Sequence, residues 1–147
     1  MGSLTRIFGK KLYVDANLFI YAIEAAEPWV EVARQILHYV DDKKISVVTS
    51  ELSLAECLVK PFQLGNQETI DIYLNLFLNR EHLTVVPVSR DLLVQAATLR
   101  AGSRMKLPDA IHAATAIKTE CDLLLTNDDR FKTLKNPEML FLGDIEI

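Results

Sequence analysis

The stretch Lys11-Leu12-Tyr13-Val14-Asp15-Ala16-Asn17 is a short apolar run that ends at a carboxylate and leads straight into a helical stretch. The same alternation of short apolar runs and helical stretches continues along the chain. We predict strands at 11–14, 45–48, 83–86, 123–125 and 140–142. We predict helices from 16, from 28 to about 40, and over 51–59, 70–78, 90–101 and 108–118. Strands that alternate with helices imply right-handed crossovers, so we expect an α/β fold with a mostly parallel sheet covered on both faces.

Three of the predicted helix limits depend on proline and glycine. Pro28 is well placed near the start of a helix, and Pro108 opens another. Pro61 and Gly65 are expected to end the helix that begins at about residue 51.

The composition is that of a single acidic domain. At 147 residues, of which 50% are hydrophobic, the chain fits one domain over 1–147. Residues 1–4 carry no fold signal, since Met-Gly-Ser is typical of an expression-vector remnant. No apolar stretch is long enough to span a bilayer, and the start lacks the pattern of a secretory signal. We therefore expect a cytoplasmic protein without a membrane partner.

Charge and cysteine usage narrow the function classes. The net charge is −4, whereas proteins that hold nucleic acid by broad electrostatics are usually basic. Any nucleic-acid role must therefore rest on a local site. Cys57 and Cys121 show neither metal-ligand spacing nor a C-x-x-C pattern, so we expect two buried free thiols.

Asp15 stands at the carboxyl end of the first predicted strand. Ligand sites of parallel sheets lie outside this end of the strands, which favours a chemical role. Aspartate is also a favoured N-cap that stabilises a helix by about 1 kcal/mol. Both interpretations of Asp15 stay open when the residue is taken alone.

Glu56 falls on an apolar stripe of its predicted helix, together with Leu52, Ala55 and Val59. A bare buried carboxylate is very costly and normally requires a partner cation. The alternative is a capping box formed with Ser53. However, the strand ends near Thr49, so Thr49 or Ser50 is the more natural cap, and we expect Glu56 to be buried beside a cation.

Asp109 lies in the first turn of its predicted helix, on the inward face that Ala110, Ala113, Ala114 and Ile117 mark. The helix dipole favours an anion there, which is the simple alternative to a functional role. His112 is a candidate proton shuttle or phosphate contact. We favour an ordinary packed or exposed helix residue at that position.

The fourth acid follows the fourth predicted strand, as Asp128 or Asp129. Asparagine and aspartate suit turns and caps, and spacing alone does not separate the two acids. Taken together, four acids fall where strand ends and helix starts converge. Clustered carboxylates repel one another unless cations neutralise them, and oxygen-only ligands select Mg²⁺ or Mn²⁺. The chemistry that suits such a site is metal-assisted phosphodiester hydrolysis.

Four motifs in order resemble those of the PIN-domain family of nucleases. They are Val14-Asp15-Ala16-Asn17-Leu18-Phe19-Ile20-Tyr21, Glu51-Leu52-Ser53-Leu54-Ala55-Glu56, Leu107-Pro108-Asp109-Ala110-Ile111-His112-Ala113-Ala114-Thr115-Ala116 and Leu124-Leu125-Thr126-Asn127-Asp128-Asp129-Arg130-Phe131. The last resembles the family pattern T-x-D-x-x-F, which selects Asp128 over Asp129. Each motif is weak by itself, but four in this order, within a resemblance that runs from Tyr13 to about Phe141, are specific.

The resemblance implies a three-layer α/β sandwich and Mg²⁺- or Mn²⁺-dependent endoribonuclease activity. It assigns Asp15, Glu56, Asp109 and Asp128 as metal ligands and catalytic residues. It also implies that Asn17 lies near the metal and that Thr126 orients the Asp15 carboxylate. Members of this length resemble VapC toxins, which are commonly homodimers and are held inactive by an antitoxin.

Basic residues flank the acidic positions on both sides: Arg100, Arg104, Lys106, Arg130, Lys132 and Lys135. They are either phosphate contacts for RNA or ordinary surface charge, and Lys106 and Arg130 are the better candidates for phosphate contacts. For a homodimer, the surfaces to test are the helix around 73–78 and the first helix, 18–23. The alternative function is a non-catalytic PIN-like domain that binds RNA or protein. A phosphoryl-accepting domain fits poorly, because a single acid follows the first strand.

Overall fold

The structure is a computed structural model that describes residues 4–145, so residues 1–3 of the suspected vector remnant lie outside the described residues. Within this range the chain forms a five-stranded, fully parallel sheet in the order β3-β2-β1-β4-β5. Its strands are β1 (Lys11–Val14), β2 (Ser46–Ser50), β3 (Leu83–Val86), β4 (Leu123–Thr126) and β5 (Glu138–Phe141). The predicted α/β class and the predicted strands are confirmed, although β2 and β5 are displaced by one or two residues.

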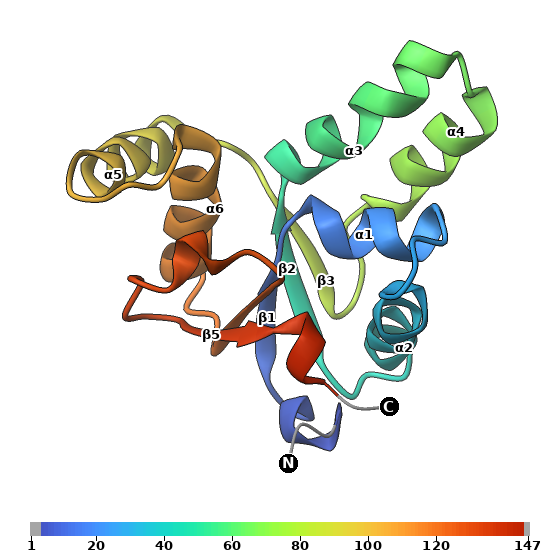
Figure 1. Ribbon diagram of the computed structural model, residues 1–147, viewed down its shortest axis with the longest axis horizontal. Coiled ribbons are helices and arrows are strands. Elements are labelled where there is room, and N and C mark those ends of the chain that lie inside the picture. Colours follow the sequence, from blue (N-terminus) through green and yellow to red (C-terminus); the bar gives the residue numbers. More distant parts are fainter. Residues whose placement is uncertain (1–3, 146–147) are drawn as a thin grey trace.

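Helices cover both faces of this sheet (Figure 1). They are α1 (Ala16–Ile23), α2 (Val30–Asp41), α3 (Glu51–Leu64), α4 (Gln67–Leu76), α5 (Arg90–Ala101) and α6 (Leu107–Lys118). Figure 1 shows α5 and α6 on one side of the sheet and α1 and α2 on the other, with α3 and α4 projecting as an arm. None of the helices in the described part of the chain is long and apolar enough to cross a membrane.

The central strand β1 divides the core between the two faces. Successive side chains of a strand point to opposite faces of the sheet. Leu12 and Val14 accordingly join the core beneath α1 and α2, whereas Tyr13 joins the core on the α6 side. Because β1 pairs with both β2 and β4, the residue that follows it, Asp15, lies at the middle of the sheet's carboxyl edge.

The prediction that α3 ends at about residue 59 is wrong, since the helix continues through Pro61 to Leu64. Proline lacks one backbone N–H and usually breaks a helix. Here Pro61 is buried on the face that also buries Ser53 and Cys57, so tertiary packing outweighs the lost hydrogen bond. The helix ends at Gly65, whose φ of 65° is left-handed and whose N–H caps the last turn.

We expect Gly65→Ala to destabilise the protein by about 1 kcal/mol, because alanine is strained at a positive φ. Urea unfolding measures this change. The matched control is Gly102→Ala at the end of α5, where φ is −97° and the nearest atom is 3.9 Å from an added Cβ. Equal losses in the two variants would contradict this role of the left-handed cap.

Part of the apolar surface expected to form a dimer is buried within the chain instead. Leu18 and Phe19 of α1 belong to the core, and so do Tyr73 and Phe77 at α4. Phe19 of α1 and Phe77 at the end of α4 contact each other, so these side chains are covered within the chain. Leu74 and Leu78 of the predicted surface stay exposed. Further large exposed apolar side chains lie chiefly on α3, α4 and α5: Val59, Phe62, Leu64, Ile72, Leu93 and Val94. Homodimerisation itself stays a prediction.

Candidate active site

Asp15 is both the N-cap of α1 and a member of an acidic cluster. Its Oδ1 accepts a hydrogen bond from the backbone N–H of Asn17 at 3.1 Å. Burial raises the pKa of Asp15, and the charges of Glu56 and Asp128 raise it further against the opposing effects of His112 and the Asn17 N–H. The capping interpretation is therefore correct, and it coexists with a carboxylate that feels its acidic neighbours.

Asp109 is the most deeply buried of the four acids described here, with an exposed fraction of 7%. The alanine stripe of α6 had predicted this inward position, and Ala110, Ala113 and Ala114 are fully buried beside it. Its Oδ2 lies 3.3 Å from Nη1 of Arg130, yet within the described residues it has no partner of hydrogen-bond geometry. One buried carboxylate oxygen is thus left with an ion pair alone.

The prediction that Glu56 lies on a buried stripe beside a cation is wrong in its first part. Its side chain is 38% exposed, and Ala55 and Val59 on the same side of α3 are also exposed. The opposite face of the helix, marked by Ser53 and Cys57, packs into the protein. The apolar spacing therefore follows an exposed face of α3. In this structure the partner of Glu56 is a histidine.

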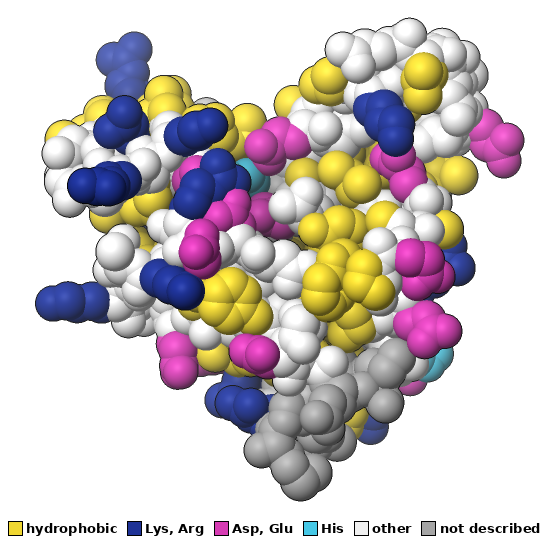
Figure 2. Space-filling model, in the orientation of Figure 1, with side chains coloured by type: hydrophobic (Ala, Val, Ile, Leu, Met, Phe, Trp, Pro, Cys, Tyr) yellow, Lys and Arg dark blue, Asp and Glu magenta, His cyan; other side chains and the backbone are white. Residues whose placement is uncertain are grey.

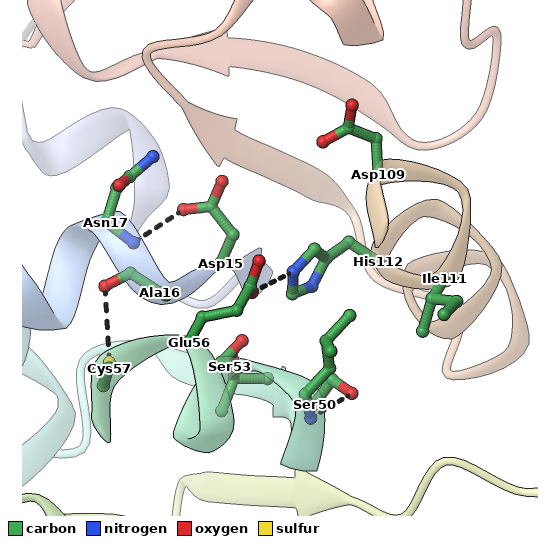
Figure 3. Close-up of polar contacts among 12 residues, drawn as sticks. Asp15, Ala16, Asn17, Ser50, Ser53, Glu56, Cys57, Asp109, Ile111 and His112 are labelled. Carbon is green, nitrogen blue, oxygen red and sulfur yellow. Dashed lines mark hydrogen bonds and ion pairs between the residues drawn. The ribbon is translucent and has the colours of Figure 1, made fainter. Parts of the chain in front are cut away.

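That histidine, His112, is packed inside the protein, as one of the two expected placements had it, and it also makes two polar contacts that the sequence did not indicate. Its Nε2 lies 2.7 Å from Oε1 of Glu56 (Figure 3). Its Nδ1 lies 2.6 Å from the hydroxyl of Tyr13. The residue is only 3% exposed. The one signal in the sequence is the i, i+3 spacing from Asp109, which places both side chains on neighbouring positions of α6. Nothing in the spacing indicates Tyr13 or Glu56 as partners.

Asp128 caps the short 3₁₀ turn Asp129–Phe131 and is held by Arg130. The backbone N–H of Arg130 donates to Asp128 Oδ1 at 2.9 Å, and its guanidinium forms an ion pair with Oδ2. Burial tends to raise the pKa of Asp128, but these hydrogen bonds and the Arg130 charge outweigh it and lower the pKa. The same guanidinium reaches Asp109, so Arg130 joins two of the acids. Asp129 is 71% exposed and pairs at 4.0 Å with Lys132.

The two predicted helper residues make contacts of a different kind. The Thr126 hydroxyl accepts a hydrogen bond from the backbone N–H of Asp128 at 3.0 Å, so it shapes the turn that carries this acid. Asn17 contacts Asp15 through its backbone N–H. A side-chain role for Asn17, and an effect of Thr126 on Asp15, stay predictions.

The donor set at this edge fits a hard cation in kind. All four acids offer oxygen, the buried Oδ2 of Asp109 lacks a hydrogen-bond donor, and the positive charge of Arg130 lies between Asp109 and Asp128. Among residues 4–145, no three acidic, histidine or cysteine side chains converge closely enough to ligate an ion as they stand. An ion would therefore require side chains at this edge to move, above all the Arg130 guanidinium, which pairs with two of the acids.

A hollow separates α5 from the arm of α3 and α4, with acidic side chains at its floor and basic side chains along its α5 side (Figure 2). Beside the acids, where the α5–α6 loop meets the turn after β4, lies a cavity of about 380 Å³. Its lining residues are Gly102, Ser103, Arg104, Met105, Asp129, Arg130 and Thr133. The cavity thus offers two guanidinium groups next to the acidic cluster.

Solved structures share this fold at low sequence identity. The chain is 22% identical to a chain of VapBC2 from Rickettsia felis bound to a promoter DNA fragment, with a TM-score of 0.68, covering 89% of this chain and 98% of that one. For a toxin–antitoxin complex from Klebsiella pneumoniae the identity is 21% and the TM-score 0.64, covering 92% and 99%. For Mycobacterium tuberculosis VapC20, a sarcin–ricin-loop-cleaving toxin, the values are 18% and 0.63, covering 77% and 86%.

The sequence itself gives the family. No curated protein sequence matches the chain significantly. The family model of the PIN domain matches residues 12–137, which run from the second residue of β1 past the turn after β4 and include all four acids. The chain therefore belongs to the PIN domain family.

Proposed function

We propose that this protein is a Mg²⁺- or Mn²⁺-dependent endoribonuclease that acts as a VapC-like toxin. The observation that carries the proposal is the buried Asp109 Oδ2, which has no hydrogen-bond donor. This oxygen lies in a cluster of acids and faces only the guanidinium of Arg130 among the described residues. A purely structural carboxylate in such a place is normally satisfied by donors, since an unmet buried acceptor is costly. The PIN domain match covers the whole cluster.

Asp15, Glu56, Asp109 and Asp128 would hold the ion. Bound there, a divalent cation supplies Lewis-acid stabilisation for hydrolysis of a phosphodiester bond. Asp15 contributes a carboxylate whose ionised form is disfavoured by burial, so a positive neighbour would stabilise that ionised form. Asp109 contributes the oxygen that has no other donor, and Arg130 keeps Asp128 ionised.

RNA would approach along the basic side of the hollow. Lys106 caps the start of α6, one turn from Asp109, and its charge lowers the pKa of Asp128 along with the stronger effects of Arg130. Arg104 lines the cavity next to Arg130. Phosphates on either side of the scissile bond would find positive charge at these positions.

We expect Lys106→Gln to weaken RNA binding and to reduce the slope of log affinity against log salt by about 0.7, the loss of one phosphate contact on a single strand. Fluorescence anisotropy with a labelled RNA at several salt concentrations measures the slope. The control is Lys118→Gln at the other end of α6, which leaves the slope unchanged because it lies about 18 Å away along the helix. An equal change in both variants would mean that RNA senses net charge rather than this position.

The partners of the proposed toxin are a cognate antitoxin and a second copy of the chain. The support is indirect, since two of the similar solved structures are toxin–antitoxin assemblies. Exposed apolar side chains such as Phe62 on α3 and Val94 on α5 are surfaces for such contacts. Coexpression with the product of a neighbouring reading frame tests the antitoxin.

The test of the proposed function is cleavage of a labelled RNA in Mn²⁺ and in EDTA. We expect cleavage in Mn²⁺ alone, and its loss in Asp15→Asn and Asp109→Asn. The matched control is Asp129→Asn, which removes an exposed acid directly after Asp128 and should retain activity. Metal-dependent cleavage that survives both Asp15→Asn and Asp109→Asn would exclude this site. RNA binding without cleavage by the wild type would favour the non-catalytic alternative.

A further inference from the structure

A buried chain of hydrogen bonds connects the first strand to Glu56 through His112. The Tyr13 hydroxyl on β1 lies 2.6 Å from His112 Nδ1 on α6, and His112 Nε2 lies 2.7 Å from Glu56 Oε1 on α3. Tyr13 and His112 are almost fully buried, whereas Glu56 reaches the hollow. Three elements far apart in sequence therefore meet at one imidazole.

The direction of the hydrogen bond between His112 and Glu56 follows from the chemistry of the carboxylate. A carboxylate accepts and does not donate, so His112 Nε2 carries a proton and donates to Glu56. Burial raises the pKa of Tyr13 well above its ordinary value, so its hydroxyl keeps its proton. In the neutral imidazole with its proton on Nε2, the Tyr13 O–H donates to Nδ1, so both ring nitrogens of His112 are engaged.

The hydrogen bond from His112 restricts the side-chain conformation of Glu56. A glutamate on an exposed helix face has many rotamers, and fixing one of them costs conformational entropy. Figure 3 shows the Glu56 carboxylate between Asp15 and His112, with one oxygen joined to the imidazole. Residues that orient a metal-binding carboxylate by hydrogen bonding commonly change affinity or activity by about 10–100-fold when replaced.

We propose that Tyr13 and His112 are positioning residues that hold the Glu56 carboxylate in the orientation needed at the acidic cluster. This inference rests on the proposed function, because it assigns Glu56 a place among the cation ligands. His112 acts through Glu56 and does not itself touch the RNA. Tyr13 acts one step further back, by fixing the ring of His112.

A double-mutant cycle between His112 and Glu56 tests this assignment. We expect His112→Leu to lower both Mn²⁺ affinity, measured by calorimetry, and RNA cleavage by about 10–100-fold. His112→Gln should recover most of the loss, since its amide nitrogen can donate from nearly the same position. Tyr13→Phe, which removes only the hydroxyl, should give a smaller loss of the same kind. In a Glu56→Gln background, His112→Leu should cause no further loss. Full losses in both backgrounds would overturn the proposal.

A spectroscopic readout keeps the inference separate from catalysis and from folding. The chain has 3 histidines, and in ¹⁵N-histidine-labelled protein we expect one to show a slowly exchanging Nε2–H. This resonance should disappear in His112→Gln, shift in Glu56→Gln and move in Tyr13→Phe. If His112→Leu does not fold, Tyr13→Phe and His112→Gln carry the test.

The two failures are distinguishable. An intact resonance and a coupled effect on Mn²⁺ affinity, without any RNA cleavage by the wild type, would leave the positioning role in place and remove the proposed function. Mn²⁺-dependent cleavage by the wild type, with a His112 resonance that does not change in Glu56→Gln, would support the proposed function and remove the positioning role. Absence of Mn²⁺ binding in the wild type would overturn both.

Discussion

Replacing Asp15 by asparagine should lower the rate of RNA cleavage by about a thousandfold while stabilising the metal-free protein. The rate falls because the substitution removes a proposed ligand of the cation. The cation contributes several kcal/mol of transition-state stabilisation, and about 4 kcal/mol corresponds to a thousandfold in rate. The gain follows because burial raises the pKa of Asp15, so the ionised carboxylate destabilises the fold at neutral pH. Asparagine is neutral and caps α1 about as well as aspartate.

The sign of this stability change depends on pH. A carboxyl group with a raised pKa in the folded state binds protons more tightly there than in the unfolded chain. Its cost is therefore present at neutral pH and disappears as the pH falls below the ordinary aspartate range. In EDTA, the urea midpoint of Asp15→Asn should exceed that of the wild type at pH 7, and the two should converge under acid conditions. A lower midpoint for the variant at pH 7 would show that Asp15 serves mainly as a structural residue.

Phe131→Ala should destabilise the protein by about 3–5 kcal/mol, the usual cost of emptying a buried aromatic site. Phe131 is 1% exposed, packs in the core cluster of Tyr13 and Leu124, and is the last residue of the turn that Asp128 caps. Urea unfolding measures the loss. The matched control is Phe62→Ala on α3, where the side chain is 61% exposed and we expect a change within about 0.5 kcal/mol.

The same substitution also links the core to the acidic cluster. Asp128 is held by Arg130, and both lie within three residues of Phe131, so loosening the turn should weaken Mn²⁺ binding as well as stability. Binding measured well below the unfolding transition separates the two effects. A loss of stability similar to that of Phe62→Ala would show that Phe131 does not anchor this turn.

The sheet could be predicted closely because buried parallel strands are nearly continuous apolar runs. The six predicted helices are all present, and the alanines of α6 placed Asp109 inward. Pro61 shows where local preference failed. Its ring sits on the packed face of α3, and that packing is invisible in the local sequence.

The sequence motifs indicated which acids belong to the cluster, but not the contacts that these acids make. The carboxyl edge of a parallel sheet brings Asp15 and Asp128 together by topology alone. The surroundings of Glu56 depended on which face of α3 the neighbouring helices cover, and apolar spacing indicated the wrong one. The polar contacts of His112 reach Glu56, which is 56 positions away in the sequence, and Tyr13, which is 99 positions away. No local pattern could have indicated them.

Single-turnover cleavage of an end-labelled RNA, followed as Mn²⁺ is added to EDTA-stripped protein, tests the proposed metal-dependent site most directly. We predict no cleavage without metal, a rate that rises to saturation with Mn²⁺ in the wild type, and no such rise at the same concentrations in Asp109→Asn. Cleavage in EDTA, or the same dependence on Mn²⁺ in the wild type and in Asp109→Asn, would contradict the assignment of this carboxylate cluster as the active site.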